Sequence, residues 1–307
     1  MKLNRKIYSD WLRQDETDAL PTEIVSVESA VSRRVASPRT NLGQGRGRLY
    51  ELFRHLADDI HDPSCTICDY GAFPGTTPRI LRDKLFPSKD YKLLAAGFNF
   101  SSDFVNAMIA RDIRVLEMEF DLRKCGKAGP PHILSGPFEQ DSQDVAICTD
   151  VIEHQMYPLS LLCGINRLLK MGGVLYLTTN SVSFIGDICK LAVGLQNLEP
   201  LEVSHVVHDD LWRPHIRLYT KRELIRLLAM AGFQIEYAYY VDNGNVFRGT
   251  KGALISTLRT FTSIVPHLRS HIFIRARKAV PAIETEGWNV VARQCTIYGI
   301  ENILGAV

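Results

Sequence analysis

One stretch, residues 65–81 (CTICDYGAFPGTTPRIL), constrains the fold of this chain more than any other. Thr66–Tyr70 is apolar or β-prone, which predicts a short buried strand. Gly71 and Gly75 supply a turn in which the backbone bends sharply or a ligand comes close to it. The residues after Gly75 are expected to begin a helix. Doubly wound α/β folds bind nucleotides at such strand–glycine–helix units, at the carboxyl ends of the strands.

The glycine pattern excludes two common phosphate-binding motifs. Phe73 occupies the middle-glycine position of the dinucleotide fingerprint, and the Gly-Lys-Ser/Thr of a P-loop does not follow. The pattern that remains is Asp69-x-Gly71-x-x-x-Gly75. It resembles the first motif of class I S-adenosylmethionine (SAM) methyltransferases, although that motif usually has a third glycine between these two. Because any α/β protein contains strand–glycine–helix turns, this resemblance needs support from the rest of the chain.

Strand and helix patterns alternate through the middle of the chain. Apolar runs predict further strands at 91–96, 113–120, 144–150, 174–179, 233–241 and 272–277. Helical patterns lie at 48–60, 76–85, 102–111, 158–170, 184–195 and 220–231, and Gly172-Gly173 is expected to stop the fourth of these. Right-handed βαβ crossovers then predict a doubly wound, mostly parallel seven-stranded sheet with helices on both faces, a Rossmann-like α/β fold.

The predicted organisation has three parts. These are an N-terminal helical lead-in and linker at 1–61, a SAM-binding core at 62–280 with a substrate-covering insert at about 182–215, and a C-terminal extension at 281–307. The basic, turn-rich segment 37–48 is expected to be a solvated loop; the alternative is a flap whose Arg46 and Arg48 contact an anion. The C-terminal extension would pack back on the core or meet a second subunit, so a homodimer is one expectation.

Composition limits the partners and the compartment. The net charge of +2 disfavours a nucleic-acid binder. The chain has no run of about eighteen apolar residues, so no membrane span is expected. The first residues lack the apolar stretch of a signal peptide. The seven scattered cysteines, an odd number, favour reduced thiols. Together these features predict a cytoplasmic protein.

The resemblance to class I SAM methyltransferases becomes specific in three segments. The first is DVAICTDVIEH (144–154), the second is LLKMGGVLYLTTN (168–180), and the third runs from HIRLYT (215–220) to AGF (231–233). Similar segments are found in many small-molecule methyltransferases. The resemblance covers roughly residues 62–241 and implies an enzyme that uses SAM as its cofactor.

The resemblance also implies a cofactor site at the ends of four strands. Asp69 would orient the glycine loop or meet the amino group of SAM through water, and Asp121 would accept a hydrogen bond from the adenine. Many members carry an acidic residue after the second strand to hold the ribose, whereas here Asn99 would serve as a neutral substitute. The implied cofactor-binding residues are Asp69, Gly71, Ala72, Phe73, Gly75, Gly97, Phe98, Asn99, Phe120, Asp121, Leu122, Thr149, Asp150 and Val151.

The candidates for chemistry follow the fourth strand and the insert. His154 has the residue type suited to a base near neutral pH, with Glu153 beside it; the alternative is that both brace the next turn. His215 and Tyr219 are further candidates, which line the substrate pocket or pin the next helix. No metal ligands are assigned. The segment around His205, His208 and Asp209 or Asp210 is interpreted as a polar substrate loop rather than as a metal site.

These features favour a methyltransferase that acts on oxygen or nitrogen of a small molecule, such as a sugar or a secondary metabolite. Two alternatives stay open. One is an RNA methyltransferase or RNA-binding relative, suggested by Arg46, Arg48 and the basic segment 269–278. The other is a catalytically silent relative that acts as a binding protein.

Overall fold

The fold is built on one seven-stranded sheet. The computed structural model describes residues 3–18, 46–98, 100, 102–118, 139–198, 215–242 and 260–282. The strand order is β3-β2-β1-β4-β5-β7-β6, and only β7 runs antiparallel to its neighbours. The strands are β1 (Thr66–Tyr70), β2 (Lys92–Gly97), β3 (Ile113–Glu117), β4 (Gln143–Thr149), β5 (Leu169–Asn180), β6 (Phe233–Val241) and β7 (His271–Lys278).

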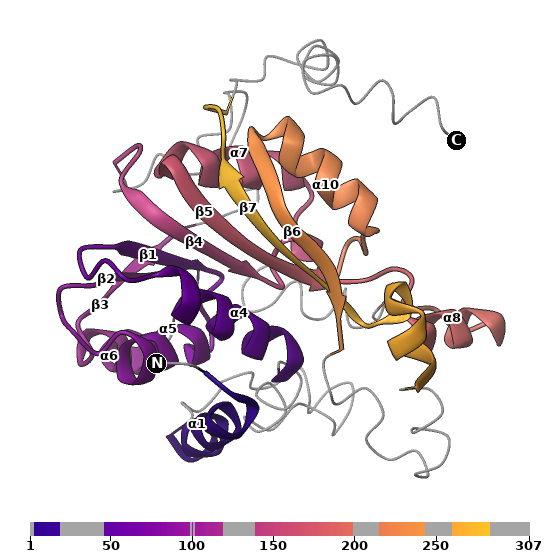
Figure 1. The fold of residues 1–307 in the computed structure, drawn as a ribbon, viewed down its shortest axis with the longest axis horizontal. Coiled ribbons are helices and arrows are strands. Elements are labelled where there is room, and N and C mark those ends of the chain that lie inside the picture. The colour runs from indigo at the N-terminus through magenta and orange to yellow at the C-terminus, as the bar shows by residue number, and fades with distance from the viewer. Residues whose placement is uncertain are drawn as a thin grey trace.

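Helices cover both faces of this sheet (Figure 1). One core cluster joins the sheet to α7 (Pro158–Leu168) and α10 (Lys221–Met230). The other joins it to α1 (Arg5–Asp18), α4 (Arg46–Asp59), α5 (Thr76–Ile80) and α6 (Ser102–Ile109). A π-helical turn, Leu81–Leu85, continues α5. The predicted doubly wound, mostly parallel sheet is therefore confirmed.

One local expectation was wrong. Gly172 and Gly173 do not stop a helix; α7 ends at Leu168, and β5 begins at the next residue and contains both glycines. The register between β4 and β5 shifts between Gln143 and Val145, and Gly172 has φ +78°, so the glycines form an irregularity within the strand. Arg48 lies in the first turn of α4, as the helical pattern at 48–60 predicts.

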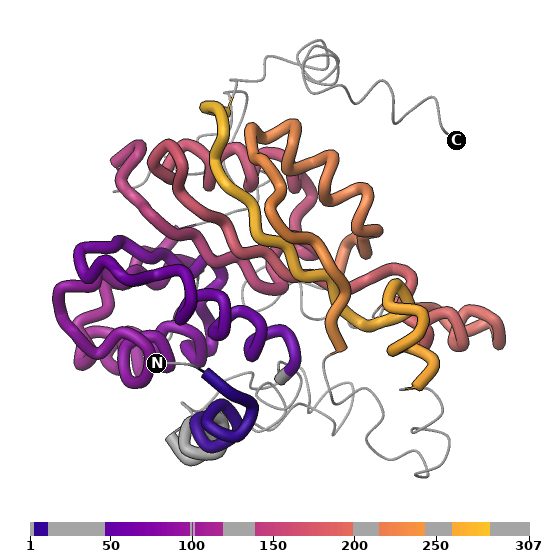
Figure 2. The backbone as a smooth tube through the Cα atoms, in the orientation of Figure 1, coloured from indigo at the N-terminus to yellow at the C-terminus, as the bar shows by residue number. Residues whose placement is uncertain are grey.

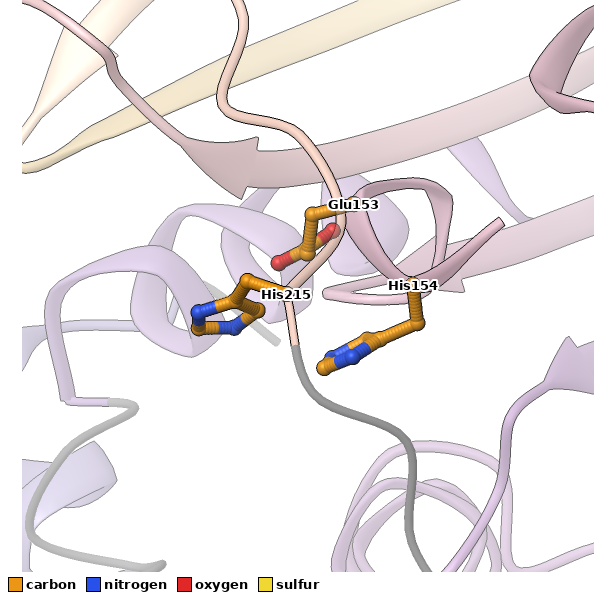
Figure 3. A group of neighbouring side chains, drawn as sticks. All are labelled: Glu153, His154 and His215. Carbon is orange, nitrogen blue, oxygen red and sulfur yellow. The ribbon is translucent and has the colours of Figure 1, made fainter. Parts of the chain in front are cut away.

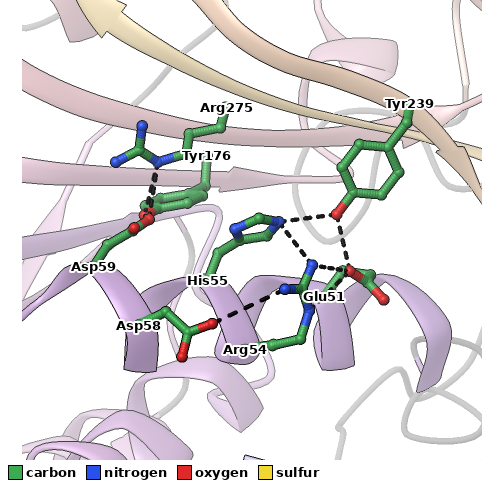
Figure 4. A network of polar contacts seen from close by, with 8 residues as sticks. All are labelled: Glu51, Arg54, His55, Asp58, Asp59, Tyr176, Tyr239 and Arg275. Carbon is green, nitrogen blue, oxygen red and sulfur yellow. Dashed lines mark hydrogen bonds and ion pairs between the residues drawn. The ribbon is translucent and has the colours of Figure 1, made fainter.

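Helix α4 is attached to the sheet by apolar and polar contacts. Leu52, Phe53 and Leu56 are fully buried in the core cluster on that face. A polar network also lies between α4 and the sheet (Figure 4). Its members are Glu51, Arg54, His55, Asp58 and Asp59 from α4, Tyr176 from β5, Tyr239 from β6 and Arg275 from β7. The helix is thus part of the same packed unit as the sheet.

A short arm extends beyond the ends of β5 and β7 (Figure 2). It consists of α8 (Ile185–Ala192), which buries no residue, and the 3₁₀ turn Pro266–Leu268. The hydroxyl of Ser183 donates a hydrogen bond to the carbonyl of His267 at 2.5 Å and joins the two segments. Within the described residues, no helix has the length and apolar character needed to cross a membrane.

The packing of α4 predicts a large effect of truncating Phe53. Phe53→Ala should lower the free energy of unfolding by about 3–5 kcal/mol, because it leaves a cavity in the core. Asp58→Ala, on the exposed side of the same helix, should cost less than about 1 kcal/mol, since only a surface ion pair is lost. Urea unfolding of both variants measures the difference. Equal costs would show that α4 is not packed on the sheet as described.

Candidate functional site

The site lies at one edge of the sheet, where the carboxyl ends of the parallel strands meet. The loops after β1, β2 and β4 begin at Gly71, Phe98 and Asp150, and β5 ends at Asn180 beside them. The order β2-β1-β4-β5 places these loops next to one another. Ligands of open α/β sheets bind at this edge.

The loop after β1 is held close to both neighbouring strands. The backbone N–H of Gly71 donates to the carbonyl of Ala96 in β2 at 2.8 Å. Gly71 has φ +77°, and a Cβ added there would lie 2.4 Å from the side chain of Val151 in the loop after β4. Gly71 is therefore needed for packing between two loops of the protein. Of the two roles that the sequence suggested, a sharp bend or a close approach of a ligand, its positive φ supports the bend. Gly75, with φ +92°, directly precedes α5.

Asp69 is a buried carboxyl at the end of β1. Its Oδ1 atom has no hydrogen-bond partner among the described residues. Burial raises the pKa of Asp69 well above its ordinary value. A polar atom in this position can accept a hydrogen bond from a ligand or a bound water.

Asp150 is fixed by partners from three elements. It has φ +54°, an uncommon conformation for a non-glycine residue. The Thr178 hydroxyl donates to its Oδ1 at 2.9 Å, and Arg48 of α4 pairs with its Oδ2 at 2.7 Å. His271 Nε2 lies 3.8 Å from the same oxygen. Burial acts to raise the pKa of Asp150, but Arg48 and then His271 outweigh it and hold that pKa below its ordinary value.

Glu153, His154 and His215 form a cluster beside Asp150 (Figure 3). Glu153 and His154 lie on the 3₁₀ turn Ile152–His154 that follows β4. The backbone N–H groups of Ile216 and Arg217 donate to the carbonyl of Glu153 at 2.8 and 3.2 Å, which brings His215 to the same place. The rings of His154 and His215 have their centroids 4.7 Å apart. Two segments separated by sixty residues thus assemble one polar cluster.

The carboxylate of Glu153 is fully buried. Its Oε2 accepts a hydrogen bond from the Thr179 hydroxyl at 2.8 Å, while Oε1 has no hydrogen-bond partner among the described residues. Burial, and then the charge of Asp150, raise the pKa of Glu153 to about 8. His215 Nε2 lies 3.3 Å from the side-chain amide of Asn180, which follows Thr179 at the end of β5.

The structure brings together some of the predicted residues and separates others. Glu153, His154 and His215 meet, but the buried hydroxyl of Tyr219 donates to the carbonyl of Ile152 at 3.3 Å, so it serves in packing. Asp69, Gly71, Ala72, Phe73, Gly75, Gly97, Phe98, Thr149, Asp150 and Val151 all lie at the carboxyl edge of the sheet, in β1, β2, β4 or the loops that follow them. Asn99, Phe120, Asp121, Leu122, His205, His208, Asp209 and Asp210 lie outside the described residues.

Two contacts of Asp150 were not predicted from the sequence: its ion pair with Arg48 and its proximity to His271. Burial lowers the pKa of His271 to about 4, with Asp150 opposing the shift. Nothing in the local pattern around these residues signals a role, because their contacts depend on the packing of α4 and the antiparallel insertion of β7. Thr178, Thr179 and Asn180 belong to the segment that carries the family resemblance, and that segment was the available signal.

Comparison with protein families identifies the class. A family model described as a methyltransferase domain matches residues 42–238. Because the match spans more than half of the chain, the protein belongs to this methyltransferase family. The predicted family, the enzyme class and SAM as the cofactor are thereby confirmed. No curated protein matches the chain.

Solved structures with a similar fold have low sequence identity to this chain. A Haloferax volcanii protein described as a putative methyltransferase, in complex with the Trm112 activator, has 17% identity and a TM-score of 0.48, covering 76% of this chain and 91% of its own. The [4+2]-cyclase SpnF has 15% identity and a TM-score of 0.48, covering 90% and 96%. A Burkholderia thailandensis 1,6-didemethyltoxoflavin N1-methyltransferase has 14% identity and a TM-score of 0.46, covering 91% and 92%.

The described residues fit SAM in one respect. Oδ1 of Asp69, which has no partner among the described residues, is an acceptor at the glycine loop, suited to the amino group of the cofactor directly or through water. Gly71 and Gly75 shape the turn of that loop, and the space beside each is taken by side chains of the protein.

Gly71 and Gly172 both have positive φ but differ in their surroundings, so alanine substitutions at the two positions test the contact between Gly71 and Val151. Gly71→Ala should destabilise the protein more than Gly172→Ala and should abolish SAM binding, because the new methyl group collides with Val151. Gly172 has φ +78° but nothing within 4 Å of an added Cβ, so its substitution should cost only the conformational strain, about 1–2 kcal/mol. Urea unfolding and calorimetric titration with SAM provide the measurements. Equal destabilisation would contradict the contact with Val151.

Asp69 gives a test that depends on pH. Its raised pKa means that the folded protein loses stability as pH rises from the unfolded pKa, near 3.9, through the folded value. Asp69→Asn should therefore raise the melting temperature of the SAM-free protein at pH 8, and this gain should shrink as the pH is lowered. The same substitution should weaken SAM binding. A gain that is independent of pH would show that Asp69 is not the titrating group.

Proposed function

We propose that this methyltransferase transfers a methyl group from SAM to an oxygen or nitrogen of a small molecule bound at the Glu153–His154–His215 cluster. The observation that carries the proposal is the cluster itself. It gathers three proton-binding side chains at the carboxyl ends of β4 and β5, beside the loop expected to hold the cofactor. His154 and His215 are half-buried, so an acceptor can reach them from outside.

The chemistry asked of these residues is limited. SAM supplies an electrophilic methyl group when bound. A hydroxyl or protonated amine acceptor must lose its proton, and an imidazole near neutral pH can assist that loss. The rest of the rate comes from holding the acceptor in line with the donor, which requires a rigid site. The contacts from Thr179, Asn180 and the backbone of Ile216 supply that rigidity.

Several of the basic residues that suggested RNA binding form ion pairs within the protein. Arg48 pairs with Asp150. In β7, Arg275 pairs with Asp59, Arg277 with Glu236, and Lys278 with Asp141. Charges that are neutralised by carboxylates contribute little to phosphate binding. This observation favours a small-molecule acceptor over RNA.

His154 tests the proposal. His154→Ala should lower methyl transfer roughly a hundredfold and leave SAM affinity and melting temperature nearly unchanged, because the loss falls on the acceptor side. Release of S-adenosylhomocysteine in the presence of hydroxyl- and amine-bearing small molecules measures the transfer, and calorimetry measures SAM binding. The matched control is His61→Ala, at an exposed histidine before β1 at the opposite end of the sheet.

The outcomes separate the two roles considered for His154. A loss of SAM affinity and stability together would show that His154 braces the loop. Parental turnover, affinity and stability in His154→Ala would exclude both roles. If the parent protein released no S-adenosylhomocysteine with any acceptor and bound no SAM, the proposal would be refuted.

A further inference from the structure

The cluster of Glu153, His154 and His215 has the donor set of a metal centre. Each side chain offers one ligand atom, and these atoms lie within 4.8 Å of one another. Two imidazoles and one carboxylate hold single transition-metal ions in sites that keep open coordination positions. Ligands about 2.1 Å from one ion stand roughly 3–4 Å apart, so small side-chain rotations would place all three around an ion.

An independent observation points to an ion. The Oε1 atom of Glu153 is buried and has no hydrogen-bond partner among the described residues. A buried carboxyl oxygen without a partner is costly, and a bound cation would supply the missing partner. Figure 3 shows the three side chains as neighbours, with the Glu153 carboxyl group beside the His215 ring and the His154 ring on the other side of the His215 backbone.

Hydrogen bonds orient the side chains of the cluster, as is usual for metal ligands. Ligating carboxylates and imidazoles are oriented by hydrogen bonds from a surrounding layer of side chains. Here the Thr179 hydroxyl donates to Oε2 of Glu153, and the Asn180 amide contacts Nε2 of His215. The two backbone hydrogen bonds to the Glu153 carbonyl fix the distance between the two segments.

We propose that Glu153, His154 and His215 bind one divalent transition-metal ion, such as Zn²⁺ or Fe²⁺, with open positions facing the half-buried side of the cluster. The imidazoles favour such an ion over Mg²⁺, which prefers oxygen ligands. This deepens the proposed function, on which the catalytic meaning of the ion rests, because an acceptor oxygen or nitrogen could occupy an open position. In the ion-bound protein His154 would be a ligand, and the ion would replace it in assisting loss of the acceptor's proton. Binding of the ion does not itself depend on that function.

The experiment uses the full chain without a polyhistidine tag, stripped with a chelator and titrated with Co²⁺. We expect one Co²⁺ per chain, visible by its d–d absorption, displaced by Zn²⁺ and unaffected by excess Mg²⁺. Glu153→Gln and His215→Ala should each weaken Co²⁺ binding by at least about a hundredfold, and Thr179→Val by about tenfold, as loss of an orienting partner does. His61→Ala should bind Co²⁺ as the parent does.

Several results would overturn the proposal. They are a parent that takes up no stoichiometric Co²⁺, displacement of Co²⁺ by Mg²⁺, or parental affinity in both Glu153→Gln and His215→Ala. Because Glu153 is buried, circular dichroism accompanies each titration, and the half-buried His215 decides the question if Glu153→Gln does not fold. SAM titration of the same samples separates the two proposals: retained SAM binding without Co²⁺ binding would remove only the metal.

Discussion

The site depends on the parallel pairing of β4 with both β1 and β5. This pairing places the ends of three strands at one edge, so that Gly71, Asp150 and Asn180 become neighbours although they are far apart in the sequence. Each strand end contributes a different element of the site: a glycine loop from β1, a carboxylate and a 3₁₀ turn after β4, and hydrogen-bond donors from β5. The side-chain contacts of the site follow from that backbone arrangement.

Three carboxyl groups lie at this edge, two of them buried and that of Asp150 half-buried, and they differ in how many of their oxygens have partners among the described residues. Asp150 has an ion pair with Arg48 and a hydrogen bond from Thr178. Among the described residues, Glu153 has one oxygen bonded to Thr179 and one without a partner, and Asp69 likewise has an oxygen without a partner. Leaving such groups unsatisfied destabilises the fold, and proteins accept this cost where a ligand completes the bonding. The contacts of Asp150 therefore indicate a role in organising the site. Asp69 and Glu153 each keep one oxygen that a ligand could use.

The sequence predicted the sheet well because its signals are local. Buried strands are short apolar runs, and the last strands at 233–241 and 271–278 carry the same pattern. The glycine pair at 172–173 was predicted to end a helix because glycine suits both a helix end and a strand irregularity. The choice between them depends on pairing with β4. Glu153, His154 and His215 were separate candidates in the sequence, but their assembly through the Glu153 carbonyl was not visible there.

Arg48 and His271 show where prediction from sequence stops. Both reach Asp150 from elements whose places are set by long-range packing: Arg48 by the docking of α4, and His271 by the antiparallel pairing of β7 beside β5. The same helix carries Phe53 in the core and Arg48 at the site, so the position of the ion pair is coupled to the packing of α4. A change that loosens α4 would therefore act on Asp150, and through its charge on Glu153, without touching the site itself.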